Sequence, residues 1–424
     1  MIVYTVRSGD SVYRIARSHS VPPNAVVMAN GLQAPDQLVV GQSLLIPTTL
    51  RDYGVLAGDS LFRIAQRFGV TIQSLLEANP QLGKGNLIRV GQRIHLPRIH
   101  FGNFVVNGYC YPTIRDDVLT EDLRHLSMLS VFSCTVDAQG NLTPMTNDSR
   151  IIEQAKAAGV RPHLVLANLG PNGFSPEIAR SVLGSARLQD AVIQSVVALM
   201  KQKGYRGLDV DFENVPRDAR ENLTMFLSKA RAAMQKERWL LTSAVPPLTR
   251  DNQTGILYEG FDFAAEGRYN DYVTLMTYEY GYQGGPPMAV APIGEVRKAL
   301  TYAISRMPRE KILMGIPNYG YDWKIPYRAG TGATVVTNTG AVAIAAREGA
   351  AIRWDETAQV PWFRYQEASG QEHEVWFEDA RSIQAKLELA HEFGIAGVSY
   401  WTVNSLFAQN WTLLEDLFRV KSLR

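Results

Sequence analysis

The chain has 424 residues, more than one ordinary domain, and its composition of 46% hydrophobic and 20% charged residues is typical of a soluble globular protein. No segment approaches the roughly 20 apolar residues of a membrane-spanning helix, so the sequence predicts no membrane insertion. The formal net charge of +2 argues against a nucleic-acid-binding protein, because such proteins normally carry a basic stripe.

The N-terminus and the cysteines bear on the compartment in which the protein works. Residues 1–6 lack the basic segment and the apolar core of a secretory signal, so we expect the chain to begin directly inside a folded unit. Cys110 and Cys134 are too few for a disulfide framework, and we expect both to be buried free thiols.

The first 97 residues contain a duplicated segment. Residues 4–12 (YTVRSGDSV) recur as residues 53–61 (YGVLAGDSL), and the Val-Gly-Gln of residues 40–42 recurs at residues 90–92. The offset is 49 residues at the start of the repeat and 50 at its end. A period near 50 residues indicates two copies of a small domain.

Each copy is expected to form a strand, two helices and a second strand. A short apolar strand leads into Gly-Asp-Ser, whose Asp or Ser can cap the next helix, and the second helix ends near Asn30-Gly31 or Asn79-Pro80. This βααβ unit resembles the LysM domain over residues 2–48 and 51–98, hereafter the first repeat and the second repeat. The resemblance implies binding of N-acetylglucosamine polymers such as peptidoglycan or chitin.

The LysM resemblance places a sugar groove between the start of the first helix and the loop before the last strand of each repeat. The residues expected there are Gly9, Asp10 and Asn30 in the first repeat, and Gly58, Asp59 and Asn79 in the second. These residue types also serve turns and helix caps, which is the structural alternative for each of them. Repeats of this kind would act as a tether, so we expect removal of residues 1–97 to weaken polymer binding while sparing hydrolysis of soluble fragments.

From about Phe101 onward, short apolar β-rich runs alternate with longer amphipathic segments. This alternation predicts βα units and a parallel sheet. Eight strands over residues 101–424 are what a (β/α)8 TIM barrel requires, and the long seventh connection, about 325–377, predicts a small α+β insertion. The expected strands lie near residues 105–108, 129–132, 163–167, 207–211, 241–245, 272–276, 312–316 and 397–401. The fold class is therefore α/β.

The segment Gly207 to Glu213 (GLDVDFE) carries three carboxylates at alternate positions. In a strand, Asp209, Asp211 and Glu213 would all face the barrel interior and climb towards its carboxyl-terminal mouth. Such a stripe raises at least one carboxyl pKa, which is what a general acid needs near neutral pH. An ion-paired structural cluster or a divalent-metal site are the alternatives. No His cluster accompanies the stripe, and we predict neither a metal nor an organic cofactor.

The stripe resembles the Asp-x-x-Asp-x-Asp-x-Glu signature of glycoside hydrolase family 18, the chitinase family. The resemblance covers residues 101–424: residues 276–279 (MTYE) resemble the Met-x-Tyr-Asp of the sixth strand, residues 315–320 (GIPNYG) the Gly-x-Pro-x-Tyr-Gly of the seventh, and residues 397–401 (GVSYW) the eighth strand. Two signature positions differ, with Arg206 for the first Asp and Phe212 for the usual Trp.

The family 18 resemblance implies a role for each matching residue. Glu213 would protonate the glycosidic oxygen, Asp211 would orient the 2-acetamido group, and Tyr278 would hydrogen-bond the acetamido oxygen. Trp401 would form the floor beneath the sugar, and Asp209 would tune Asp211. The acetamido oxygen would attack the anomeric carbon, which predicts retention of configuration and a need for an N-acetylated sugar.

Several further residues are expected to bind substrate. Glu279 replaces the Asp of Met-x-Tyr-Asp and is expected to affect specificity more than the reaction. Tyr280 and Tyr319 belong to an aromatic cluster with Tyr282, Tyr321 and Trp323, whose members either stack on flanking sugars or pack in the core. Asn168, after the third strand, could also reach the site.

Paired LysM domains before a family 18 barrel resemble the cortical-fragment-lytic enzymes of endospore-forming bacteria. The resemblance implies an N-acetylglucosaminidase that degrades spore cortex peptidoglycan during germination. It also implies a location in the cortex or coat region, with the cell wall as the alternative. The expected partner is peptidoglycan or another N-acetylglucosamine polymer, with no obligate protein partner. A chitinase or chito-oligosaccharide hydrolase is the first alternative. A non-catalytic sugar-binding coat protein is the second, and it is disfavoured because the predicted catalytic residues are all present.

Overall fold

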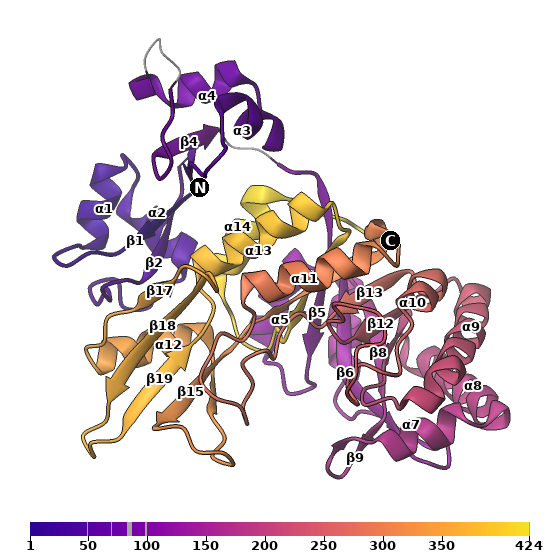
Figure 1. Ribbon diagram of the computed structural model, residues 1–424. Helices are drawn as coiled ribbons and strands as arrows, with labels where there is room; N and C mark the ends of the chain where they lie inside the picture. The colour runs from indigo at the N-terminus through magenta and orange to yellow at the C-terminus, as the bar shows by residue number, and fades with distance from the viewer. Residues whose placement is uncertain (49, 69, 83–86, 98–99, 424) are drawn as a thin grey trace.

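The computed structural model describes residues 1–48, 50–68, 70–82, 87–97 and 100–423 and is shown in Figure 1. The predicted ends of the second repeat at residue 98 and of the barrel at residue 424 lie outside the described residues. Within the described residues, no helix combines the length and the hydropathy needed to cross a bilayer.

Both repeats have the predicted βααβ arrangement. The first contains β1 (Ile2–Thr5), α1 (Val12–Ser18), α2 (Pro23–Asn30) and β2 (Ser43–Ile46). The second contains β3 (Leu50–Gly54), α3 (Leu61–Arg67), α4 (Ile72–Ala78), the 3-10 helix η1 (Pro80–Leu82) and β4 (Arg93–Pro97). In each repeat the two strands pair antiparallel, and Ser11 or Ser60 caps the first helix by accepting a backbone N–H.

The predicted (β/α)8 barrel is confirmed. Eight parallel strands form a closed ring, because β20 pairs with β5 through Gly397 and Val105. The ring comprises β5 (Asn103–Cys110), β6 (Met128–Val136), β8 (Arg161–Ala167), β11 (Gly207–Asp211), β12 (Leu240–Val245), β13 (Tyr272–Leu275), β14 (Ile312–Pro317) and β20 (Gly397–Trp401). The short strands β7 (Leu142–Thr143) and β21 (Arg419–Val420) extend the sheet.

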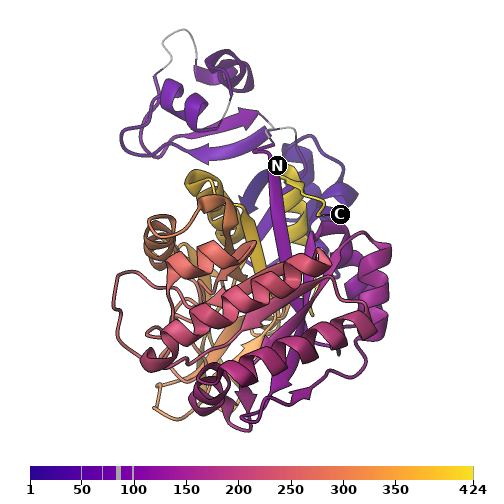
Figure 2. The same ribbon diagram turned by 90° about the vertical axis from the view of Figure 1, so that its right-hand side faces the viewer.

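Helices cover the outside of the ring, and their apolar faces form one core with it (Figures 1 and 2). They are α5 (Asp116–Asp122), α6 (Ser149–Ala157), α7 (Pro176–Leu183), α8 (Ala186–Lys203), α9 (Arg220–Glu237), α10 (Phe263–Tyr269), α11 (Ile293–Ile304), α13 (Ala380–Phe393) and α14 (Ala408–Leu417). Short 3-10 helices are η2 (Leu123–His125), η3 (Arg217–Ala219) and η4 (Arg309–Lys311). Cys110 and Cys134 are buried free thiols, as predicted.

Two additions to the barrel shape its carboxyl-terminal mouth. After β8, the strands β9 (Leu169–Gly170) and β10 (Gly173–Phe174) form a small hairpin. After β14 comes the insertion, a five-stranded antiparallel sheet with one helix. Its elements are β15 (Gly320–Ile325), β16 (Thr334–Val336), α12 (Asn338–Arg347), β17 (Arg353–Asp355), β18 (Val360–Gln366) and β19 (Glu372–Trp376). The insertion therefore begins at Gly320, before the predicted start near residue 325, because β15 pairs with β19 rather than with the barrel.

The two repeats attach to different parts of the barrel (Figure 1). The first repeat packs along its flank, against α14, the start of α13 and the insertion. The second repeat lies at the amino-terminal end of the barrel strands (Figure 2). There Phe101, just before β5, stacks on Phe68 and on His391.

Candidate active site

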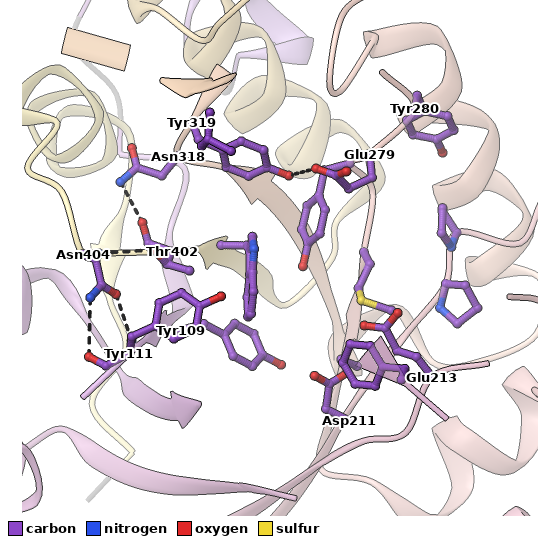
Figure 3. A pocket seen from close by; sticks show the side chains of 18 of the residues that line it. Tyr109, Tyr111, Asp211, Glu213, Glu279, Tyr280, Asn318, Tyr319, Thr402 and Asn404 are labelled. Carbon is purple, nitrogen blue, oxygen red and sulfur yellow. Dashed lines mark hydrogen bonds between the residues drawn. The ribbon is translucent and has the colours of Figure 1, made fainter. Parts of the chain in front are cut away.

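A cleft of about 760 Å³ opens at the carboxyl ends of the barrel strands, where TIM-barrel active sites lie (Figure 3). The insertion contributes residues 335–337 to its wall, the β9–β10 hairpin contributes Phe174, and the loop after β12 contributes Pro246, Pro247 and Tyr258. Three acidic residues line this cleft: Asp211, Glu213 and Glu279 (Figure 3).

The deepest carboxylate of the stripe is Asp209, which is buried and held from two sides. Its Oδ2 accepts a hydrogen bond of 2.6 Å from the Tyr109 hydroxyl, and its Oδ1 accepts one of 2.6 Å from Thr242 Oγ1. Burial raises the pKa of Asp209, while these two hydrogen bonds oppose the increase. Tyr109 and Thr242 therefore fix the orientation of the carboxyl group at the base of the site.

The next two carboxyls, Asp211 and Glu213, have a raised pKa. Burial raises the pKa of Asp211 well above its ordinary value, and the charges of Glu213 and Asp209 add to this. Burial, with the charge of Glu279, raises the pKa of Glu213 to about 7. Oδ1 of Asp211 is buried and has no hydrogen-bond partner among the described residues. Glu213 can thus carry a proton near neutral pH, and Asp211, which lines the cleft, retains one oxygen without a hydrogen-bond partner among the described residues.

Trp401 lies at the end of its predicted strand, whereas Tyr278 comes three residues after the end of β13. Tyr278 follows β13 and lines the cleft, and burial, together with the charges of Asp211 and Glu213, raises the pKa of its hydroxyl. The hydroxyl therefore stays protonated and can donate a hydrogen bond. Trp401 ends β20 and lines the cleft, and its ring makes edge-on contact with Phe132 at a centroid distance of 4.9 Å, which restricts the orientation of the indole.

The substituted Glu279 is fixed by two tyrosines. Its Oε1 accepts hydrogen bonds from the Tyr319 hydroxyl and, at 2.8 Å, from the Tyr321 hydroxyl (Figure 3). Burial raises the pKa of Glu279, and the two tyrosine hydrogen bonds oppose that shift. Tyr280 also lines the cleft. Trp323 does not, because its ring is buried and its Nε1 donates to the Gly285 carbonyl, and Tyr282 lies outside the cleft.

The prediction that Asn168 contacts substrate is wrong. Its side chain is fully buried and does not line the cleft. Its amide group makes hydrogen bonds to the backbone of Glu213 and Ser175 instead. Of the two altered signature positions, Phe212 packs against Phe226 behind the barrel, and Arg206 precedes β11 at its amino-terminal end.

The side-chain amides of Asn30 and Asn79, which were predicted to bind sugar, make hydrogen bonds within their own repeats. Asn30 donates to the Val26 and Leu45 carbonyls and accepts from Leu45 N, while Asn79 makes the same bonds to Leu75 and His95. Each side chain therefore joins the second helix to the last strand of its repeat, and neither is free to bind a sugar.

The residues at the first turn of each repeat are more accessible. Gly9 and Gly58 are exposed, with φ of 82° and 84°, which suits a tight turn. Asp10 and Asp59 are partly exposed, and each accepts a hydrogen bond from a tyrosine hydroxyl, Tyr4 or Tyr53. These four residues remain candidates for a sugar contact.

Sequence reasoning missed the aromatic side of the cleft. Tyr109 and Tyr111, at the end of β5, and Tyr258, after β12, all line it. The alternation of Asn107, Tyr109 and Tyr111 was the available signal, since it places all three on one face of the first strand. No group of three or more His, Cys, Asp or Glu side chains within the described residues could hold a metal ion.

Comparisons with known proteins agree along the whole chain. The family described as Glycosyl hydrolases family 18 matches residues 153–405, and the LysM domain matches residues 4–47 and 53–97. The cortical fragment-lytic enzyme of Bacillus subtilis (strain 168) is 38% identical over 99% of each chain. That of Bacillus anthracis is 37% identical over 99% of this chain and 98% of its own length.

Solved structures give the same picture. The crystal structure of the Bacillus cereus spore cortex-lytic enzyme SleL has a TM-score of 0.91 and 37% identity, covering 99% of this chain and 98% of that one. A chitinase from Chromobacterium violaceum ATCC 12472 has a TM-score of 0.68 and 28% identity, covering 74% of this chain and 98% of that one. The similarity to the SleL structure thus includes both repeats, whereas the similarity to the chitinase is confined to about three quarters of the chain.

Proposed function

Since the chain belongs to glycosyl hydrolase family 18 and carries two LysM domains, we propose that it is an N-acetylglucosaminidase that degrades spore cortex peptidoglycan or its fragments. The observation that carries the proposal is the carboxylate stripe in the cleft, with Glu213 at a pKa of about 7 beside the buried acceptor of Asp211.

The proposed reaction begins with proton transfer. Glu213 donates its proton to the glycosidic oxygen as the bond to the anomeric carbon breaks, and the acetamido oxygen of the same sugar attacks that carbon. Oδ1 of Asp211 accepts the acetamido N–H, and the Tyr278 hydroxyl donates to the acetamido oxygen until it attacks. Glu213, now ionised, then takes a proton from the water that opens the cyclic intermediate. Configuration at the anomeric carbon is retained.

The supporting groups fit these steps. Trp401 offers an apolar face for the sugar ring. Asp209, fixed by Tyr109 and Thr242, lies below Asp211, and its charge adds to the effects of burial and of Glu213 that raise the pKa of Asp211. The charge of Glu279 adds to burial in raising the pKa of Glu213, so its two tyrosine partners help to set the acidity of the proton donor.

The choice of peptidoglycan rests on the relatives that match both repeats and the barrel, since their names refer to cortical fragments or spore cortex. The same relatives support a location in the spore cortex or coat region. Chitin is the alternative substrate, because a chitinase of known structure shares the barrel at 28% identity.

Mass spectrometry of the products tests the proposal. The protein is incubated with purified spore-cortex muropeptides and, separately, with chitin oligosaccharides. We expect muropeptide products that end in a reducing N-acetylglucosamine. Cleavage of chitin oligosaccharides alone would make the protein a chitinase, and no cleavage of either substrate would support a sugar-binding coat protein.

A further inference from the structure

The backbone of Glu213 lies beyond the barrel sheet. Strand β11 pairs with β8 up to Asp211 and Ala167, and with β12 up to Val210 and Ser243. Glu213 comes two residues after the last of these pairs, so no strand on either side fixes its backbone. A general acid must hold its carboxyl within hydrogen-bond reach of the leaving oxygen, so another group has to fix it.

The side chain of Asn168 supplies those bonds. Its Oδ1 accepts from the Glu213 N–H at 2.9 Å, and its Nδ2 donates to the Glu213 carbonyl at 2.8 Å. Asn168 comes directly after Ala167 of β8, so its amide continues the hydrogen bonding of β8 where the backbone ladder stops. A primary amide can accept from an N–H and donate to a C=O at once, as a neighbouring strand does, whereas a carboxylate or an alkyl group of the same size cannot.

The same amide connects the acid to the β9–β10 hairpin. Nδ2 of Asn168 also donates to the Ser175 carbonyl at 2.9 Å, and Ser175 N donates back to the Asn168 carbonyl at 2.9 Å. A second amide, Asn214 Nδ2, donates to the Phe174 carbonyl at 3.0 Å. Phe174 lines the cleft, so the hairpin that forms part of the wall is bonded to the segment that carries the acid.

We propose that Asn168 is a positioning residue for the general acid: its buried amide replaces the missing strand and holds the Glu213 backbone, together with the hairpin wall, in the geometry for proton transfer. The inference rests on the proposed role of Glu213. Asn168 does not line the cleft, so we expect its loss to impair the step that needs a proton much more than it weakens substrate binding.

The first test is the kinetics of Asn168→Ala on soluble cortex fragments. We expect kcat to fall by about 10- to 100-fold and KM to stay within about twofold of wild type, since general acid catalysis contributes about 10²–10⁴-fold in rate. A folded Asn168→Ala protein whose kcat stays within about threefold of wild type would overturn the inference. So would a loss that appears mainly in KM.

The dependence on the leaving group separates positioning from general damage. On a 2,4-dinitrophenyl β-glycoside of N-acetylglucosamine, whose leaving group needs no proton, Asn168→Ala should lose much less rate than on cortex fragments. An equal loss on both substrates would contradict the positioning role. Glu213→Gln is measured in parallel. If it lacks the same dependence, the proposed acid is wrong; if it shows the dependence and Asn168→Ala does not, only the role of Asn168 fails.

Two further variants distinguish a loss of positioning from a general loss of stability. Asn214 has φ of 53°, a conformation that glycine adopts readily, so Asn214→Gly should fold and loosen only the bond to Phe174. It should show the same kinetic pattern as Asn168→Ala with a smaller loss. Asn270 is a fully buried amide that bonds Ser243 and Glu266 away from the cleft. Asn270→Ala should therefore lower the unfolding temperature without changing the leaving-group dependence.

Discussion

The first and second repeats share a fold and a sequence pattern, but they are joined to the barrel in different ways. In the first repeat, Leu45 is fully buried in the core of the barrel, and Val39 is buried in the core of the insertion. Each repeat also has a small apolar core of its own, but among the described residues only the first repeat places buried side chains in the cores of the barrel and the insertion as well. The first repeat is therefore joined to the barrel and the insertion through shared apolar cores, whereas the second repeat is a nearly independent module.

The hydrogen bonds of the two repeats show the same difference in how each repeat is joined to the barrel. Nε2 of Gln409, on α14, donates to Asn30 Oδ1 and to the Ser43 carbonyl, both at 2.8 Å and both buried. In the second repeat the equivalent oxygen of Asn79 accepts instead from Gln81 of the same repeat, at 3.0 Å. The same asparagine thus serves an interface in one copy and an internal loop in the other.

The difference changes what removal of the repeats should do. The sequence suggested a tether whose loss spares hydrolysis of soluble fragments. The insertion that the first repeat packs against also forms the cleft wall at residues 335–337, so loss of the first repeat should disturb the cleft itself. Polymer retention without a catalytic effect is expected of the second repeat only.

The largest expected effect comes from unfolding one repeat at a time. Ile15 and Ile64 occupy equivalent buried positions, and an unpaired buried carboxylate at either site costs several kcal/mol, enough to unfold a small module. Ile15→Asp should destabilise the barrel and lower hydrolysis of soluble fragments. Ile64→Asp should spare both and reduce binding to insoluble cortex. Calorimetry, a soluble-fragment assay and a pull-down with cortex measure the three properties, and identical behaviour of the two variants would remove the distinction.

A milder test changes only the interface. Leu45→Ala leaves a cavity between the first repeat and the barrel and should cost about 2–5 kcal/mol in the free energy of unfolding. The equivalent residue of the second repeat is the half-buried His95, and His95→Ala should cost less than about 1 kcal/mol. Denaturant unfolding of both variants gives the comparison, which fails if the two costs are equal.

The pH dependence separates catalysis from retention. Glu213 must be protonated to act, and its pKa is about 7, so hydrolysis should fall as pH rises through 7, approaching tenfold per pH unit well above it. Binding to insoluble cortex does not involve this proton and should not follow that curve. Rates and pull-downs from pH 5 to 9 test this, and a rate that is flat across about pH 7 would contradict the assignment of the acid.

The smallest effect is expected at the surface contact of the second repeat. Arg67 and Glu392 are 3.9 Å apart and both partly exposed, and Glu392 is also paired with Arg297. Exposed ion pairs contribute about 0–1 kcal/mol, so Arg67→Ala should change the unfolding free energy by less than about 0.5 kcal/mol. A loss above about 1 kcal/mol would mean that Arg67 stabilises the protein through more than this surface pair, and its hydrogen bond to the Tyr53 hydroxyl inside the second repeat would then be the contact responsible.

The sequence predicted the barrel and the stripe because both depend on local periodicity. Alternation alone directs Asp209, Asp211 and Glu213 to one face, and strand order brings Tyr278 and Trp401 to the same mouth. The contacts of Asn168 and Asn30 could not be predicted, since an amide carries no sign of its partners, and Asn168 bonds a residue 45 positions away.

One signal for the docked repeat was present in the sequence. The last strand of the first repeat reads Ser-Leu-Leu-Ile and is buried on both faces, whereas that of the second reads Arg-Ile-His-Leu-Pro and alternates. An apolar residue on the outward face of a two-stranded sheet indicates that something covers it. Which surface covers it depends on the packing of α14 and the insertion, which no local pattern specifies.

The most direct test of the proposed function is Glu213→Gln, assayed for both hydrolysis of cortex fragments and retention on insoluble cortex. Hydrolysis should fall by at least about 100-fold, because glutamine cannot donate the proton, while retention is unchanged. Residual hydrolysis within about tenfold of wild type, in a protein that still binds cortex, would contradict Glu213 as the general acid.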